Sequence, residues 1–188
     1  MKLTEPKQTD CGQYTFDGLT VEKTKENKGH GVILMKKIAP GTAWPICGRG
    51  MTKEKMENLD ETKLSHLWEH KGESGTGRPV DGKPIKGKDR EGEAACGGLG
   101  IAMMINEPNR EGEANCIFDK NMLVLIKENG IGEEATVNYG MDPEIVKRRY
   151  NYEVVREPGA LDHIQMEYPE NIDEKIKSIT RKWQKNCG

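Results

Sequence analysis

Three short segments of the sequence hold the residues best suited to bind a ligand or to take part in chemistry. In Gly29-His30-Gly31, two glycines one residue apart let the backbone approach a ligand closely and offer it N–H and C=O groups. Asn106 and Glu107 end an apolar run, so the Asn106 amide must either brace the backbone or hold a polar ligand. Tyr139 ends a short strand that follows a glycine turn, and most tyrosines in such places cap a core.

The histidines and cysteines show no spacing typical of a metal site. The cysteines are scattered, with no C-x-x-C pair, which favours free thiols in a reducing compartment over a disulfide framework. His66 and His70 stand four residues apart, but no H-E-x-x-H motif surrounds them and no third ligand is evident. We therefore expect no metal, no membrane contact, and an intracellular location, nuclear or cytoplasmic.

Composition and charge narrow the class of protein further. The 188 residues suffice for one core of ordinary size, and the 22 glycines and 9 prolines indicate many turns rather than a helical bundle. Basic and acidic residues number 29 and 31 and are well mixed, which argues against direct nucleic-acid binding through a basic surface. A groove for a basic peptide such as a histone tail is compatible with this balance.

Hydrophobic periodicity places the three segments among short strands and helices. Stretches of β-type pattern predict strands, at residues 14–16, 19–21, 31–35, 116–118, 122–126 and 135–139. Stretches of helical spacing predict helices, at residues 52–70, 143–154 and 169–183. We expect hairpins around Asp17-Gly18 and around residues 119–121, and long loops with one short hairpin in residues 71–92.

One strand-turn pattern occurs twice. Residues 32–36 followed by Gly41 match residues 123–127 followed by Gly132 at the same spacing. The repeat is too short for a solenoid, so it indicates one strand-turn-strand unit used twice. The predicted fold is therefore β-rich and flanked by helices, the last of which carries Ile172, Ile176, Ile179 and Trp183 on one face.

Taken together, the three segments resemble the SET-domain family of protein lysine methyltransferases. The similar sections are KGHGVILMKKIAPGTAW, GGLGIAMMINEPN, ANCIF and VLIKENGIGEEATVNYG, of which GEE-x-T-x-x-YG is the most specific. The resemblance implies an α+β, mostly β fold of several short sheets (the β-clip) with a knot-like core, an inserted helix and C-terminal helices. It also implies a division into an N-terminal extension (1–13), a SET domain (14–152) with a variable insert at about 51–92, and a C-terminal helical extension (153–188).

The same resemblance implies S-adenosylmethionine as cofactor and methyl transfer to the lysine amine of a protein or peptide substrate, either a histone or a non-histone protein. Gly29, His30 and Gly31 would hold the methionine end of the cofactor through backbone groups. Asn106 would hold its amine or carboxylate, and the backbone around Asn106 and Glu107 would meet the adenine. Tyr139 matches the catalytic tyrosine, which would orient the amine and also bind the cofactor by contacting its methyl group.

The chain also departs from the family, and these departures leave alternatives open. Glu107 stands where the family commonly has histidine, and the cysteine-rich flanking segments are absent. The helix around Tyr150 and Tyr152, or the terminal helix with Trp183, would then have to close the lysine channel, while Trp68 either lines that channel or anchors its helix. One alternative is a catalytically silent module that binds cofactor or peptide, and another is an enzyme of this fold acting on a small molecule. The oligomeric state stays open.

Overall fold

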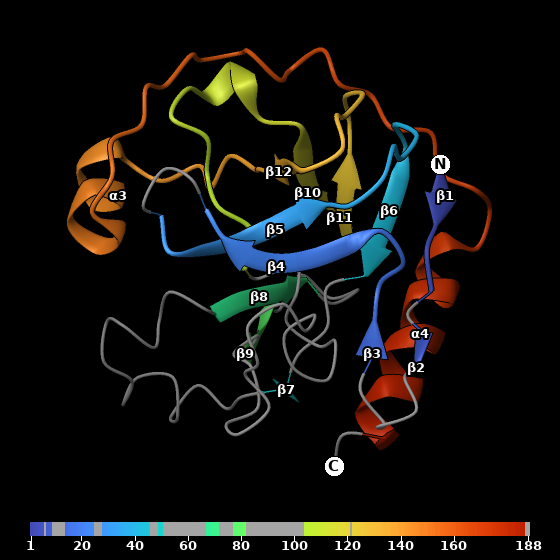
Figure 1. The fold of residues 1–188 in the computed structure, drawn as a ribbon. Coiled ribbons are helices and arrows are strands. Elements are labelled where there is room, and N and C mark those ends of the chain that lie inside the picture. The colour runs from blue at the N-terminus through green and yellow to red at the C-terminus, as the bar shows by residue number, and fades with distance from the viewer. Residues whose placement is uncertain are drawn as a thin grey trace.

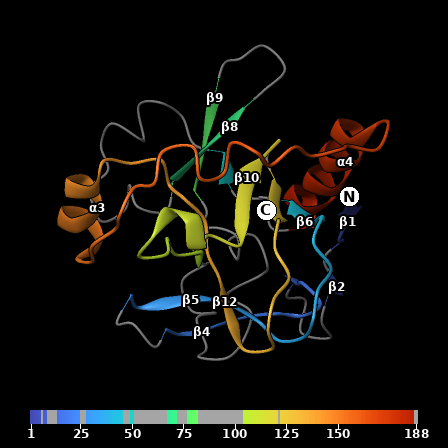
Figure 2. The ribbon, with the colours of Figure 1, turned by 90° about the horizontal axis from the view of Figure 1, so that it is seen from above.

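The computed structural model describes residues 1–5, 7–8, 14–24, 28–45, 49–50, 67–71, 77–81, 104–120 and 122–186. Their strands form four small sheets. The first contains β1 (Lys2–Leu3), β6 (Thr42–Pro45), β11 (Met122–Leu125) and β10 (Cys116–Asp119), and the second contains β12 (Glu133–Ala135), β5 (His30–Leu34) and β4 (Leu19–Lys23). The third pairs β2 (Lys7–Gln8) with β3 (Tyr14–Thr15), and the fourth contains β7 (Arg49–Gly50), β9 (Gly77–Asp81) and β8 (Leu67–Lys71). Two α-helices in this part of the chain, α3 (Pro143–Tyr150) and α4 (Ile172–Asn186), lie on opposite sides of the sheets (Figures 1 and 2). The predicted class, mostly β in several short sheets with C-terminal helices, is confirmed.

The repeated strand-turn-strand unit is present twice, and its two copies exchange partners. The first strand of one copy, β5, pairs with β12 from the other, and β6 pairs with β11 in the same antiparallel way. The turns match as well, because Gly41 N–H donates to Leu125 O over 2.7 Å and Gly132 N–H donates to Leu34 O over 2.8 Å. Gly41 and Gly132 both have φ of +81°, a conformation that favours glycine and explains the spacing seen in the sequence.

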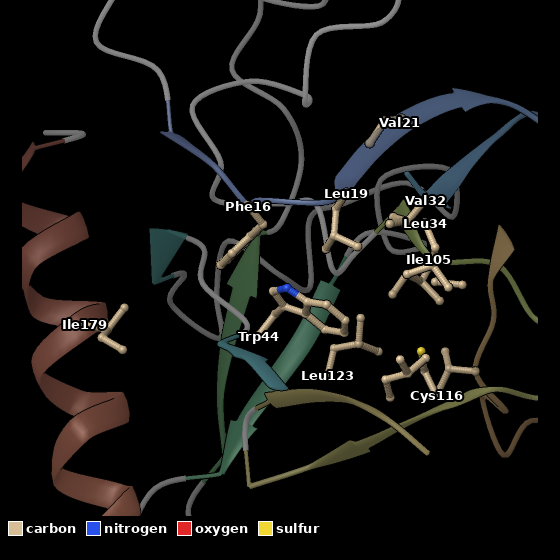
Figure 3. Packing of buried hydrophobic residues seen from close by; sticks show 13 residues of the cluster. Phe16, Leu19, Val21, Val32, Leu34, Trp44, Ile105, Cys116, Leu123 and Ile179 are labelled. Atoms are coloured by element: carbon tan, nitrogen blue, oxygen red, sulfur yellow. The ribbon is translucent and has the colours of Figure 1, made fainter. Parts of the chain in front are cut away.

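The main core lies between the sheet of β1, β6, β11 and β10 and the sheet of β12, β5 and β4, and it continues to α4. Trp44 is fully buried among side chains from both sheets and from the segment before Asn106 (Figure 3). The buried residues of the main core are Phe16, Leu19, Val21, Val32, Leu34, Trp44, Ile105, Cys116, Leu123, Leu125, Ala135, Val137 and Ile179. A second buried cluster joins α4 to the other face of β6 and β11, through Ala43, Met122, Val124, Ile172 and Ile176. The predicted apolar face of the last helix is therefore confirmed for its three isoleucines.

Two predictions for the N-terminal half need correction. Strands do flank Asp17-Gly18, but they do not pair with each other, because β3 pairs with β2 and β4 pairs with β5. Both Phe16 and Leu19 enter the core at this turn, so the chain crosses from one sheet to another there. The predicted helix over residues 52–70 is wrong at its end, since Leu67–Lys71 is strand β8, hydrogen-bonded to β9. Residues 52–66 lie outside the described ranges.

The hairpin of β8 and β9 agrees with the single short hairpin that we expected in this stretch, although β8 begins before residue 71. The hairpin of β10 and β11 around residues 119–121 is confirmed. The helix that opens at Pro143 ends at Tyr150 rather than Val154, because Asn151 has φ of 60° and its N–H caps the Lys147 carbonyl at 2.9 Å. The division into three domains remains a prediction.

Candidate functional site

Two segments far apart in the sequence meet at the candidate site. Residues 105–107 run parallel to the chain that follows β12, with a bridge between Asn106 and Thr136. The Val137 N–H donates to the Asn106 carbonyl over 3.0 Å. This contact brings Tyr139 beside Asn106 and Glu107, as the family resemblance implies. The knot-like threading of these segments remains a prediction.

Asn106 braces two strands. Its side-chain Nδ2 donates to the His30 carbonyl over 3.1 Å and to Glu134 Oε1 over 2.7 Å, and the residue is 8% exposed. A buried amide of this kind is stabilised only when its donors find partners. Of the two roles that the sequence left open, the structure displays bracing contacts, and a contact between Asn106 and the cofactor remains a prediction.

Gly29 and Gly31 require glycine for different reasons. A Cβ atom on Gly31 would lie 2.2 Å from Glu134 Oε1 and 2.8 Å from Asn106 Nδ2, so a side chain at this position would force these groups to shift. Gly29 has open space around it, but its φ of +81° lies in the region that favours glycine. His30 between them is exposed at its side chain, and its carbonyl accepts the Asn106 bond. The backbone of this segment is thus held against the Asn106 side chain.

Tyr139 is fixed at both ends. Its hydroxyl donates to the Ile105 carbonyl over 2.6 Å, and its backbone N–H donates to Glu107 Oε1 over 2.9 Å. Its ring lies 5.4 Å from the ring of Tyr150, and Tyr152 follows at 6.1 Å from Tyr150. Burial raises the pKa of Tyr139 well above its ordinary value, and the neighbouring Tyr152 adds to this rise. The Tyr139 hydroxyl is therefore protonated at neutral pH.

The Glu107 carboxylate is held in the interior by a backbone N–H group and a guanidinium. The side chain is fully buried, and its Oε1 accepts both the Tyr139 N–H and the guanidinium of Arg156. The other oxygen, Oε2, has no hydrogen-bond partner in the described part of the chain. The Glu107 backbone accepts from Lys28 Nζ at 3.0 Å and donates to the Tyr152 hydroxyl at 3.3 Å. The Glu107 side chain thus faces the interior and braces Tyr139.

Arg156 is the site residue that the sequence did not reveal. It stands 49 residues from Glu107 in a segment of mixed charge, and no motif surrounds it. The one available signal was indirect, because a carboxylate at the end of an apolar run requires a cation if it is buried. That signal predicts a partner for Glu107 without saying which basic residue supplies it.

A cavity of about 610 Å³ opens beside these residues. Its lining carries side chains of both charges together with an aromatic ring and an aliphatic group: Lys28, Asn109, Arg110, Glu113, Tyr152, Glu153 and Val155. Lys28 Nζ lies 5.1 Å from the centre of the Tyr152 ring, so the two side chains that bond the Glu107 backbone also share a wall of this cavity. The predicted Gly29 follows Lys28 directly and places the glycine segment next to the cavity.

The described ranges contain no cluster of metal-binding side chains and no membrane-spanning helix. No group of three or more His, Cys, Asp or Glu side chains there could hold a metal ion, and no helix there is long and apolar enough to cross a membrane. Cys116 is a free thiol buried in the core, and burial strongly raises its pKa, so it does not form the reactive thiolate. The absence of a resident metal remains a prediction.

No family profile and no curated protein matches the chain. Similar solved structures include a candidate histone methyltransferase of Plasmodium falciparum, 14% identical over 66% of this chain and 95% of that one, with a TM-score of 0.44. The methyltransferase domain of human PR domain-containing protein 2 is 17% identical over 67% of this chain and 79% of its own, with a TM-score of 0.45. The SET domain of the RIZ1 tumor suppressor (PRDM2) is 21% identical over 71% of this chain and 82% of its own, with a TM-score of 0.41. TM-scores below 0.5 establish neither family membership nor activity.

Proposed function

We propose that the protein is a SET-domain enzyme that transfers a methyl group from S-adenosylmethionine to the side-chain amine of lysine in a protein substrate. The observation that carries this proposal is the meeting of Tyr139, Asn106 and the Gly29–Gly31 segment, next to a cavity whose lining residues Lys28 and Tyr152 bond the Glu107 backbone. These are the residues that the family motifs single out, and they come from three separate parts of the chain.

The cavity suits S-adenosylmethionine in size and in chemistry. Its volume of about 610 Å³ lies within the range of small-molecule sites. The cofactor carries a flat purine, a carboxylate, an ammonium group and a sulfonium, and the lining offers the Tyr152 ring, the cations Lys28 and Arg110, and the carboxylates Glu113 and Glu153. When bound, the cofactor supplies the electrophilic methyl group.

The Glu107 backbone groups are already bonded to Lys28 and Tyr152, which line the cavity. These two side chains therefore lie where the adenine contact of Glu107 was expected. We assign the purine to the Tyr152 ring, because a half-buried aromatic face stacks well on a flat heterocycle. Asn106 and the backbone of Gly29-His30-Gly31 would then hold the amino-acid end of the cofactor.

Tyr139 orients the acceptor amine without acting as a base. A free lysine has a pKa near ~10.4, so most of it is charged at neutral pH and cannot attack. Burial beside the rings of Tyr139, Tyr150 and Tyr152 would favour the neutral amine. Because the pKa of Tyr139 is raised, its hydroxyl stays protonated and offers an oxygen that aligns the amine with the methyl group.

A pair of substitutions separates cofactor binding from transfer. Titration calorimetry should show S-adenosylmethionine bound by the wild type and by Tyr139→Phe, and bound weakly or not at all by Asn106→Ala. Transfer of a radiolabelled methyl group to core histones or lysate proteins should fall at least ~100-fold in Tyr139→Phe, because only the positioning hydroxyl is lost. Tyr168→Phe is the matched control. The Tyr168 hydroxyl has no hydrogen-bond partner in the described residues, and the residue packs against the second buried cluster, which contains Ile172 and Ile176 of α4.

The results also separate the alternatives. Binding by the wild type without transfer to any protein would support a silent binding module or a small-molecule enzyme instead. Equal transfer by Tyr139→Phe and the wild type would remove Tyr139 from the mechanism. No binding of the cofactor would contradict the proposal as a whole.

A further inference from the structure

Arg156 contacts the chain on both sides of Tyr139. Its Nη1 donates to Asn138 Oδ1 over 2.8 Å and to the buried carboxylate of Glu107. Its Nε donates to the Met141 carbonyl over 2.9 Å. The same Glu107 oxygen accepts the Tyr139 N–H. The Arg156 guanidinium therefore contacts Asn138 before Tyr139, Met141 after it, and the Glu107 carboxylate that holds the Tyr139 backbone.

The segment that carries Arg156 is itself held by its neighbours along the chain. Val155 N–H donates to the Asn109 carbonyl over 2.7 Å, and the Glu111 N–H donates to the Val155 carbonyl over 3.0 Å. On the other side, the Glu157 N–H donates to Glu111 Oε2 over 3.0 Å. In Figures 1 and 2 this part of the chain leaves α3 and runs past the 3₁₀ turn Glu111–Glu113. The position of Arg156 is thus set on both sides by bonds to residues 109–111.

The pair of Glu107 and Arg156 is charged and almost out of contact with water. The Glu107 side chain is fully buried and the Arg156 side chain is 19% exposed. A buried carboxylate that loses its cation is strongly destabilised, so it must take up a proton or move. Either change alters the acceptor that the Tyr139 N–H depends on. Lysine cannot fully replace arginine here, because only the guanidinium fork reaches several acceptors at once.

We propose that Arg156 is a positioning residue, which acts through Glu107 and Asn138 to place the Tyr139 hydroxyl for methyl transfer. This proposal rests on the function proposed above, but the position of Tyr139 can be measured without any methyl transfer. The proposal assigns the segment after α3 to the active centre, although this segment contains none of the motifs that first identified the site.

Fluorine NMR of protein labelled with 3-fluorotyrosine measures the environment of Tyr139 directly. The chain has five tyrosines, and Tyr139→Phe identifies the Tyr139 signal. In Arg156→Gln this signal should change its chemical shift, with a smaller change in Arg156→Lys. Lys36→Gln is the matched control, because it removes a cation from the exposed pair with Asp17 and should leave the Tyr139 signal unchanged.

Two further outcomes decide the proposal. An unmoved Tyr139 signal in folded Arg156→Gln would overturn it and leave Arg156 a purely structural residue. If Arg156→Gln does not fold, the double variant Glu107→Gln with Arg156→Gln removes both buried charges and should fold with a shifted Tyr139 signal. An unshifted signal in that variant would again overturn the proposal.

Kinetics then connect the position of Tyr139 to the reaction. The single-turnover rate of methyl transfer in Arg156→Gln should fall at least ~10-fold, while the Kd for S-adenosylmethionine stays within ~2-fold of the wild type. Arg156→Lys should recover part of the rate. A rate equal to that of Lys36→Gln would overturn the proposal. Failure of the wild type to transfer methyl groups would instead contradict the proposed function, and the fluorine signal would still report whether Arg156 positions Tyr139.

Discussion

At the residue scale, Gly29 and Gly31 test the site because each position favours glycine for a different reason. Gly31 is crowded by neighbouring side chains, and Gly29 has a left-handed backbone conformation. Gly31→Ala forces a methyl group against Glu134 and Asn106, and overpacking of this kind costs ~1–3 kcal/mol. Gly29→Ala meets no neighbour and bears only the cost of the left-handed backbone, ~1 kcal/mol. Urea denaturation should show the larger loss in Gly31→Ala, and calorimetry should show that this variant also loses cofactor affinity. Equal losses of stability would mean that the packing around Gly31 is looser than the structure has it.

The buried tyrosines predict how stability depends on alkaline pH. Burial raises the pKa of Tyr152 to about 12, and it raises the pKa of Tyr139 as well. In the unfolded chain both ionise near ~10, so the folded state keeps its protons to higher pH. The free energy of unfolding is therefore fully retained below pH ~10 and falls as the pH rises toward the folded pKa values. Tyr152→Phe should flatten this decline, as followed by urea denaturation at a series of pH values.

Absorbance of phenolate offers an independent check. The phenol groups of Tyr139 and Tyr152 should ionise above the ordinary tyrosine value in the wild type, and Tyr139→Phe and Tyr152→Phe should each remove one late-ionising group. Titration of all the tyrosines near pH ~10 in the folded protein would contradict the burial of this pair.

The sequence predicted the members of the site that lie in local motifs and missed the one that does not. Gly31, Asn106 and Tyr139 each stand in a recognisable segment, and the structure brings the three segments together. The bracing role of Glu107 and its bond to Arg156 depend on burial and on a contact 49 residues along the chain. Periodicity and composition carry no information on such a contact.

At the element scale, the exchanged pairing of the two strand-turn-strand units holds the site segments in register. The pairing of β5 with β12 places Ile33 opposite Glu134, and the Glu134 carboxylate then accepts the Asn106 amide. Local patterns predicted several of the strands, the repeat and the hairpin of β10 and β11, but they did not predict the exchanged pairing of the two units. The hairpin predicted around Asp17-Gly18 was wrong, because β4 pairs with β5, the next strand along the chain, and not with β3.

On helix α4, we expect alanine substitutions at Ile176 and Ser178 to differ in their effect on the stability of the protein. Ile176 is 4% exposed and packs in the cluster beneath β6 and β11, so Ile176→Ala should destabilise the protein by ~2–5 kcal/mol. Ser178, two residues later, is exposed, and Ser178→Ala should change the stability by no more than ~0.5 kcal/mol. Thermal or urea unfolding of both variants measures this difference. Little change in Ile176→Ala would mean that α4 is not docked as the structure has it.

At the scale of the whole molecule, the C-terminal part of the chain does more than cover the sheets. Ile179 of α4 belongs to the main core, and the segment before α4 contributes Tyr152 to the cavity and Arg156 to the support of Tyr139. The glycine and proline content and the short strands made the β-rich class predictable from sequence. The sequence put Tyr152 among the candidates for closing the channel, but it did not predict the contribution of Arg156, because the ion pair with Glu107 forms only after folding.

The central claim is that the protein methylates lysine, and mass spectrometry tests it most directly. Wild-type protein, Tyr139→Phe and Tyr168→Phe would each be incubated with core histones or lysate proteins and S-adenosylmethionine carrying a trideuterated methyl group. Fragment spectra should place the labelled methyl group on lysine Nζ for the wild type and Tyr168→Phe, and the label should be nearly absent for Tyr139→Phe. Label found on another side chain, or equal labelling by Tyr139→Phe, would contradict the assignment of lysine as acceptor or of Tyr139 as the catalytic residue.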